Sequence, residues 1–462
     1  MGAARHLQQH MKRSSMRLVC ALVAVAVICC TAFVSAGYRL GVVHNQRIQA
    51  LAQCNAARSA LSRNLKTLRN ASLLSDDVAP VEANIKAAFA GNPALTDFES
   101  SRAHAATLLA EPSRQCPANG SIPELSMLTT TLRGRAQTVR SHARELTQAS
   151  DKVANLTNAG PRRTLATAIS QAQWWVDFTA GQVSDESTRI ALSEAIGNAR
   201  NLLDGNGIVM DRQPYMQQVA ALNAAMDAVA VSHNAKLGVD CSKVACVALT
   251  FDDGPNAKNT PVVIDVLRRT KTTATFFTVG EHVAKPDEGK LTVSLTRAGY
   301  PIGNHSWSHA NLATLGDTDL TAQLQRTNDE IEQTTGYAPL MIRPPYSSWN
   351  DAVRQRAIAM NAAIINYDTI GVDWARTAPQ VRANVGRWTK PGSIILLHDP
   401  QDSTAQSIES IITDLKARGF VFVTIPQLLG GLPKPGWVYY SRTGYLTPDQ
   451  PWTDSSYFTA EW

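Results

Sequence analysis

Side chains capable of hydrolytic chemistry stand in short clusters in the second half of this chain. The first cluster carries adjacent aspartates, Asp252 and Asp253, directly after an apolar run, and adjacent carboxylates repel unless a cation or hydrogen bonds offset their charge. The second carries His305 and His309, an i and i+4 pair that shares one face of a helical turn. Two imidazoles and one aspartate leave open positions for water around a metal ion, so this pattern predicts a catalytic metal centre rather than a structural one.

Three later clusters are weak when each is taken alone. They are Arg343–Tyr346, in which two prolines stiffen the loop that holds the guanidinium group, the pair Asp373-Trp374, and Leu396–Asp399, which includes His398. A surface turn or an ordinary core histidine would explain any one of them. These three clusters become informative because of the order in which they follow the first two clusters.

In this order the clusters resemble the motifs of polysaccharide deacetylases of the NodB-homology type, carbohydrate esterase family 4. The resemblance runs from about Cys246 to Leu429 and says nothing about residues 37–240. It implies one divalent metal ion, with zinc favoured and cobalt or another divalent ion as alternatives. By this resemblance the ligands would be Asp253, His305 and His309.

The same resemblance implies roles for the remaining motif residues. Asp252 would be the general base and His398 the general acid, with Arg343 orienting the base and Asp373 orienting the acid. The residues implied for the oxyanion and the acetyl slot are Tyr346, through its backbone N–H, and Trp374 and Leu396.

The function implied is metal-dependent hydrolysis of N-acetyl groups on N-acetylhexosamine units of a cell-surface polysaccharide, with peptidoglycan favoured. Two other functions stay open. One is an O-acetyl esterase acting on a xylan-like polymer, which could use the same chemistry. The other is a non-enzymatic glycan-binding module, which would bind the sugar without hydrolysing it. Acetate release from chitin oligomers or from acetylated xylan would separate them.

The elements around these clusters predict an α/β fold. Apolar β-rich runs alternate with helical patterns from residue 241 to residue 430, which is typical of parallel βα units. The expectation is a distorted (β/α)7-type barrel, whose chemistry would gather at the carboxyl ends of its strands. The runs are Ala245–Phe251, Ala274–Val279, Tyr300–Asn304, Leu340–Arg343, Ala363–Tyr367, Ser393–Leu397 and Phe420–Thr424.

The N-terminus predicts export. Residues 1–17 form a basic tail, expected to be cytoplasmic, and residues 18–36 form an uncharged apolar run that would span about 28 Å as a helix. The basic flank favours a single-pass anchor in the cell membrane with the rest of the chain outside, and a cleaved signal peptide is the alternative. Residues 37–240 show helical periodicity and predict an extracellular, coiled-coil-like all-α stalk domain whose partner the sequence does not name.

The charge and the cysteines add further expectations about partners and disulfide bonds. The chain of 462 residues is 44% hydrophobic and 18% charged, a globular composition. Its net charge of +6 is not concentrated in any basic region, so a nucleic-acid partner is not expected.

Outside the cell, Cys241 and Cys246 would form a local disulfide. Whether Cys54 and Cys116 are also bonded is left undecided by the sequence. The aromatic-rich tail, residues 431–462, is expected to pack on the barrel, with a sugar-stacking platform as the alternative.

Overall fold

The computed structural model describes residues 42–75, 92–157, 159–204 and 211–450. The chain divides into two compact units, Met1–Arg69 with Ala103–Glu145, and Asn70–Arg102 with Leu146–Trp462. The predicted tail 1–17 and membrane segment 18–36 lie outside the described residues. Within the described ranges, no helix combines the length and the apolar character that a membrane span needs.

The first unit is built from long helices. It contains most of a helix over residues 42–75, the end of α3 (Pro93–Ala110) and the first part of α4 (Ile122–Thr157). Buried residues such as Leu61, Leu132 and Val139 form its apolar interior. A disulfide joins Cys54 to Cys116, so the structure contains the bond that the sequence left undecided.

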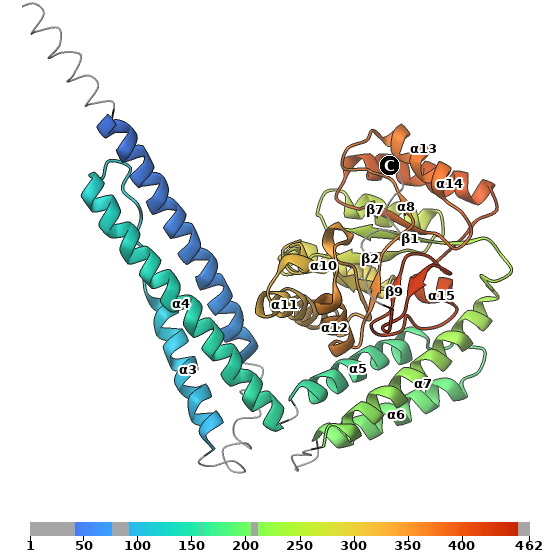
Figure 1. The fold of residues 1–462 in the computed structure, drawn as a ribbon. Coiled ribbons are helices and arrows are strands. Elements are labelled where there is room, and N and C mark those ends of the chain that lie inside the picture. The colour runs from blue at the N-terminus through green and yellow to red at the C-terminus, as the bar shows by residue number, and fades with distance from the viewer. Residues whose placement is uncertain (1–41, 76–91, 158, 205–210, 451–462) are drawn as a thin grey trace, which may run out of the picture. The chain divides into compact units, whose positions relative to one another are not determined.

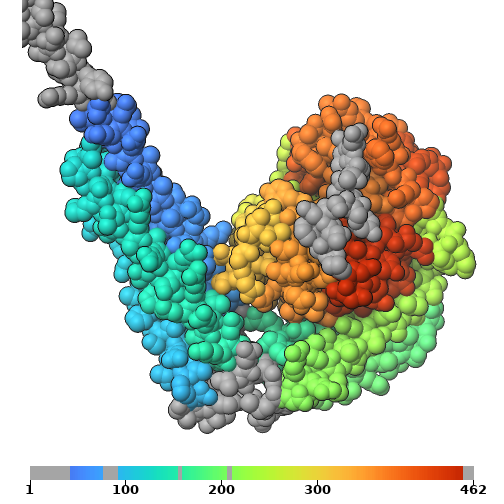
Figure 2. Space-filling view, viewed as in Figure 1, coloured from blue at the N-terminus to red at the C-terminus, as the bar shows by residue number. Residues whose placement is uncertain are grey.

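Three further helices belong to the second unit and not to a separate stalk. They are α5 (Ala159–Phe178), α6 (Ser187–Asp204) and α7 (Gln213–Leu237). Their shared apolar core also contacts Leu340 and Leu432 of the α/β part, and Figure 2 shows the green surface of these helices continuing into the red surface. The predicted domain boundary at residue 240 therefore falls inside one compact unit, in which the core of these helices contacts the α/β part through Leu340 and Leu432.

Each predicted β-rich run forms a strand (Figure 1). The corresponding strands are β1 (Cys246–Asp252), β2 (Thr275–Thr278), β3 (Ile302–Asn304), β4 (Met341–Ile342), β5 (Ala363–Ile365), β7 (Ile394–His398) and β8 (Val421–Val423). Three strands were not predicted: β6 (Thr369–Ile370), β9 (Val438–Tyr439) and β10 (Tyr445–Leu446).

The sheet is curled and open, whereas we expected a distorted (β/α)7-type barrel. Its order is β10-β9-β5-β4-β3-β2-β1-β7-β6, with β8 also paired to β1, and every pairing is parallel except β9 with β10. The end strands share no ladder in the described part of the chain, and only a bridge between Ser393 and Ser441 links the two sides. The hairpin β9–β10 occupies the edge beside β5 where a further βα unit would stand, so part of the predicted tail is a component of the sheet.

Helices pack on this sheet, most of them on its outer face, although Ile425 and Leu428 pack with Cys246 and Ala248 of the inner face. The helices are α8 (Thr260–Arg269), α9 (Gly280–Val283), α10 (Pro286–Arg297), α11 (Asp317–Thr335), α12 (Asp351–Ala359), α13 (Ala378–Trp388), α14 (Asp402–Ala417) and α15 (Ile425–Leu429), with short 3-10 turns at Leu312–Thr314 and Pro345–Ser347. In β1 the odd positions, such as Leu249, pack in the same core as residues of α8 and α14. Because side chains alternate along a strand, Thr250 and Asp252 share the opposite, inner face. Most of the helices thus cover one side, while the polar residues face inward.

Candidate active site

The predicted site residues meet at one end of the sheet. Asp252 ends β1, His398 ends β7, and Arg343 directly follows β4. His305 directly follows β3, and Asp373 lies in the loop after β6. Since these strands are parallel, their carboxyl ends share one edge, and residues far apart in sequence become neighbours there.

Asp253, His305 and His309 form a compact group of metal-ligating side chains. Their ligand atoms all lie within 4.8 Å of one another. The Oδ1 atom of Asp253 is 3.2 Å from Nε2 of His305 and 3.1 Å from Nε2 of His309. This oxygen is buried and has no hydrogen-bond partner among the described residues.

The supporting hydrogen bonds indicate that a cation fits this group. The Nδ1 atom of His305 lies 2.7 Å from the carbonyl oxygen of Arg343, which can only accept, so Nδ1 carries a proton. A neutral His305 then presents a lone pair on Nε2 toward a carboxylate oxygen, and a cation between these acceptors would satisfy both. Burial raises the pKa of Asp253, whereas positive charge on the neighbouring histidines lowers it well below its usual range. A cation held by the same side chains would supply that charge while His305 stays neutral.

The predicted base, Asp252, is fixed by a buried guanidinium group. Arg343 is 1% exposed, and its Nη1 donates to Oδ1 of Asp252 at 2.8 Å and to the hydroxyl of Thr250 at 2.7 Å. Its other nitrogens donate to the carbonyl oxygens of Ile365 and Asn366. The paired charge offsets the cost of burying either group alone, and one rotamer of Asp252 is held in place.

The predicted acid, His398, is held by Asp373. Nδ1 of His398 lies 2.7 Å from Oδ1 of Asp373, and the backbone N–H of His398 donates to Oδ2 at 2.7 Å. Burial would lower the pKa of His398, but the hydrogen bond and charge of Asp373, followed by Asp253 and Asp252, raise it to about 9. The free Nε2 lies 3.9 Å from Oδ2 of Asp253. An imidazolium at this place is suited to donate a proton.

Backbone conformations that side chains rarely adopt concentrate in these loops. Asp253, His309, Tyr346 and Val372 all have φ between 53° and 69°. Each such residue costs on the order of 1–3 kcal/mol, and the cost is greatest for a β-branched residue such as Val372. Strain of this kind is typical of functional loops that the surrounding structure holds in place.

The residues predicted to bind substrate differ in exposure, and Tyr346 makes a contact with His309. Tyr346 is 68% exposed and Trp374 is 54% exposed, whereas Leu396 is buried within β7. The indole ring of Trp374 lies edge-on to His398, with 5.3 Å between ring centroids. The hydroxyl of Tyr346 lies 3.2 Å from Nδ1 of His309, a contact that no sequence pattern indicated.

Some supporting residues were missed at the sequence level. His282, in α9, contacts the carbonyl oxygen of Asp253 through Nδ1 at 2.9 Å. Thr404, in α14, donates its hydroxyl to Oδ2 of Asp373. His282 could have been noticed as a histidine just after a strand, but nothing local to Thr404 distinguishes it from other helical threonines.

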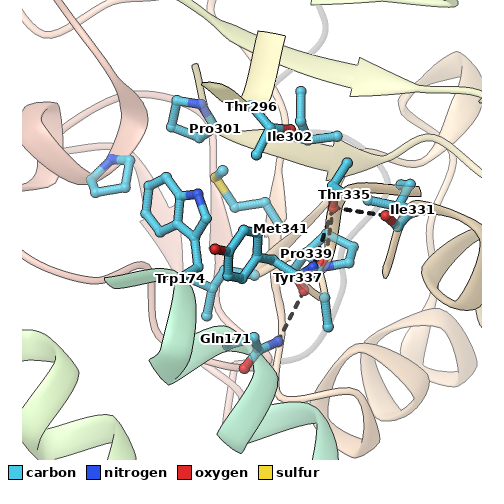
Figure 3. Close-up of a pocket in the computed structure, with 13 residues that line it drawn as sticks. Gln171, Trp174, Thr296, Pro301, Ile302, Ile331, Thr335, Tyr337, Pro339 and Met341 are labelled. Atoms are coloured by element: carbon cyan, nitrogen blue, oxygen red, sulfur yellow. Dashed lines mark hydrogen bonds between the residues drawn. The ribbon is translucent and has the colours of Figure 1, made fainter. Parts of the chain in front are cut away.

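A small pocket lies away from this site (Figure 3). It has a volume of about 40 Å³ and is lined by residues that include Trp174, Tyr337 and Met341. Met341 begins β4, so the pocket is at the opposite end of the strands. Gln171 of α5 donates there to the carbonyl oxygen of Pro339 at 2.9 Å, which ties the helices to the α/β part.

Comparison with known proteins matches the α/β part of the chain. The sequence model of the family described as polysaccharide deacetylase matches residues 240–365, ending before Asp373 and His398. Peptidoglycan-N-acetylglucosamine deacetylase PgdA of Listeria monocytogenes is 36% identical over 198 residues, which are 43% of this chain. The match spans only 41% of the Listeria protein.

Two other relatives are covered more completely. The chitooligosaccharide deacetylase of Sinorhizobium fredii is 33% identical over 198 residues, covering 39% of this chain and 90% of that protein. Among solved structures, the peptidoglycan deacetylase PdaC from Bacillus subtilis is 34% identical, with a TM-score of 0.39 over 41% of this chain and 92% of the other.

Proposed function

Because this chain belongs to the polysaccharide deacetylase family, we propose that it hydrolyses N-acetyl groups on N-acetylhexosamine units of a cell-surface polysaccharide. The observation that carries the proposal is the placement of two acid–base pairs beside one group of metal ligands. Oδ2 of Asp252 lies 3.8 Å from Nε2 of His305, and Nε2 of His398 lies 3.9 Å from Oδ2 of Asp253. Both pairs are therefore within reach of one bound substrate.

A divalent ion held by Asp253, His305 and His309, with zinc favoured, would supply Lewis acidity to the substrate carbonyl and to water. This chain's own residues would move the protons. Asp252, oriented by Arg343, accepts a proton from the attacking water as its oxygen bonds to the acetyl carbon. The backbone N–H of Tyr346 donates to the developing oxyanion.

Breaking the carbon–nitrogen bond requires a proton on the leaving nitrogen, since an unprotonated amine is a poor leaving group. His398, charged through its contact with Asp373, donates that proton from Nε2. The products are acetate and a free amino sugar. Trp374 and Leu396 would line the space for the acetyl methyl group.

Peptidoglycan is the favoured polymer because relatives carry that substrate in their names. One is named for N-acetylglucosamine and another, PdaC of Bacillus subtilis, for N-acetylmuramic acid. We leave the choice between these two sugars to the assay. Chitin oligomers are the simplest probe, because the Sinorhizobium relative is named for chitooligosaccharides.

The test is acetate release by the purified full chain from peptidoglycan, chitin oligomers and acetylated xylan. We expect release from the N-acetylated substrates, loss of activity after chelation, and recovery with zinc or cobalt. Release from acetylated xylan alone would favour an O-acetyl esterase. No acetate from any of them, with sugar binding retained, would favour a glycan-binding module.

We also propose that the protein is anchored in the cell membrane with its α/β part outside. The support is the basic residues 1–17 followed by the apolar residues 18–36. Protease added to intact cells should then digest a tag fused after residue 462. A tag protected until the cells are lysed would contradict this placement.

A further inference from the structure

Asp399 is a buried carboxyl group that the proposed mechanism does not use. It follows the predicted acid His398 and is 1% exposed. Its carboxyl group lies directly against Gly254, the residue after the predicted metal ligand Asp253. A Cβ atom added at Gly254 would overlap both carboxyl oxygens of Asp399, so only glycine fits beside this side chain.

A hydrogen-bond chain continues this contact into the start of α8. The hydroxyl of Thr260 donates to Oδ2 of Asp399 and accepts from the backbone N–H of Asn256 at 2.7 Å. The Oδ1 atom of Asp399 is buried without a hydrogen-bond partner among the described residues. Asp399 therefore accepts a hydrogen bond from Thr260, at the far end of the loop that begins with Asp253. Its carboxyl group also fills the space beside Gly254.

The other side of the same loop is held by the segment after β2. The backbone N–H of Val279 donates to the carbonyl oxygen of Gly254 at 2.9 Å, and His282 contacts the carbonyl oxygen of Asp253. The loop is thus held between Asp399 on one side and the start of α9 on the other. Its lateral position, and with it the position of Asp253, depends on both supports.

We propose that Asp399 is a positioning residue, whose carboxyl group packs between Gly254 and Thr260 and sets the separation of Asp253 from His398. The inference rests on the proposed function for its effect on catalysis, but not for its effect on metal affinity. Burial raises the pKa of Asp399 to about 7, which is consistent with a role through shape and hydrogen bonding. An asparagine has the same shape and can still accept from Thr260.

The expected effects follow from the geometry of supporting residues. Loss of a partner that orients a ligand typically weakens metal binding by about 10–100-fold. A displacement of about 1 Å in a catalytic group can cost about 10²-fold in rate. A leucine at position 399 fills the same space with an apolar side chain. It removes the hydrogen bond from Thr260 and places its branched end toward Gly254.

The experiment compares Asp399→Asn and Asp399→Leu in the full chain, with Asp402→Asn as the matched control. Asp402 is an exposed carboxylate at the start of α14, three positions after Asp399, and it pairs with Lys258. The measurements are zinc affinity by competition with a chromophoric chelator, kcat and KM on chitin oligomers, and thermal unfolding. We expect Asp399→Asn and Asp402→Asn to stay within about 3-fold of the parent in every constant. We expect Asp399→Leu to lose about 10-fold or more in zinc affinity and in kcat, with KM little changed.

A folded Asp399→Leu protein with parental zinc affinity and kcat would overturn the proposal. So would an Asp399→Asn protein that loses as much as Asp399→Leu, because shape and hydrogen bonding would then not account for the effect. If Asp399→Leu does not fold, the pair Gly254→Ala and Gly254→Ala/Asp399→Ala replaces it. Overlap with the carboxyl group predicts that Gly254→Ala weakens zinc binding and that the second substitution adds no further loss. Additive losses would contradict the proposed contact.

Failure of the proposed function has a different signature. If the parent protein released no acetate from any N-acetylated glycan, the deacetylase proposal would fail, while the zinc-affinity comparison would still decide the role of Asp399. If acetate release is normal and the zinc affinities of all variants agree, the positioning role alone is excluded.

Discussion

At the level of single residues, each proposed acid–base group has one charged partner that fixes its orientation. Arg343 holds Asp252 through a guanidinium nitrogen at 2.8 Å, and Asp373 holds His398 through a carboxylate oxygen at 2.7 Å. Neither Asp252 nor His398 belongs to the group of metal ligands that the geometry brings together. Proton transfer and metal binding are therefore separable by substitution.

The substitutions Asp252→Asn and His398→Ala should each lower kcat by about 10²–10⁴-fold, the usual contribution of a general base or acid. Neither should release the metal, because neither is a predicted ligand. Asp253→Asn is the contrasting variant and should lose it. Metal content after dialysis, measured beside acetate release, checks all three. Near-parental turnover or loss of metal in Asp252→Asn would contradict the roles assigned to Asp252 and Asp253.

The pH dependence should report His398. Its pKa is raised to about 9, and the protonated form is the one that donates, so kcat should fall as the pH rises through that value. Asp373→Asn removes the hydrogen-bonded carboxylate and should move this alkaline limb to lower pH, toward the ordinary value of about 6.5. Asp265→Asn, at an exposed carboxylate on α8, serves as the control. An unmoved alkaline limb in Asp373→Asn would exclude His398 as the acid.

At the level of elements, the two disulfides close loops of very different length. Cys241 and Cys246 are separated by 5 positions, at the start of β1, and Cys54 and Cys116 by 62 positions, in the first unit. A longer loop loses more conformational entropy in the unfolded chain when it is closed. The two bonds should therefore stabilise their units unequally.

Replacing Cys54 and Cys116 by serine should lower the free energy of unfolding of the first unit by about 4 kcal/mol. The same replacement at Cys241 and Cys246 should cost the second unit only about 2 kcal/mol. Denaturant unfolding measures both free energies of unfolding. Hydrogen exchange is the readout, because it reports on each unit separately. A larger cost for the short loop would show that the entropic account does not hold here.

At the level of the whole molecule, the helices α5–α7 belong with the curled sheet. Buried amides join them: Gln171 donates to the carbonyl oxygen of Pro339, and Asn361 donates to the side-chain oxygens of Gln171 and Asn223. Their apolar core includes contacts with Leu340 and Leu432. Separating these helices from the sheet would expose the part of that core that contacts Leu340 and Leu432, and would leave these amides without their partners across the contact.

Two truncated chains test this division. A chain beginning at residue 146 keeps α5–α7 and should unfold cooperatively with acetate release near that of the full chain. A chain beginning at residue 241 lacks them and should have a lower Tm and poorer solubility, because apolar surface and the amide of Asn361 are exposed. Thermal unfolding and light scattering provide the comparison. Equal Tm values would indicate that the helices are not part of the stable core.

Much of the site could be predicted from the sequence because the residues of each motif lie close together in the chain. Asp252 and Asp253 are adjacent, and His305 and His309 are four positions apart, so their types and spacing predicted a metal centre of two histidines and one aspartate. The choice of Asp253 over Asp252 as the ligand came from the family resemblance. The strands were predictable for the same reason, since alternation and apolar runs are local. The assignments of Asp252 as base and His398 as acid came from the family resemblance, and both remain predictions.

Only the tertiary structure decided which distant segments meet. It placed Asp399 against Gly254 and Gln171 against Pro339, contacts between residues far apart in the chain. The contact of Arg343 with Asp252 had been implied only by the family resemblance. The tertiary structure also left the sheet open, because the β9–β10 hairpin adds to the edge beside β5 instead of a further βα unit. Such contacts depend on the order in which strands pair and on which apolar faces they cover, and no local pattern of residues encodes that order.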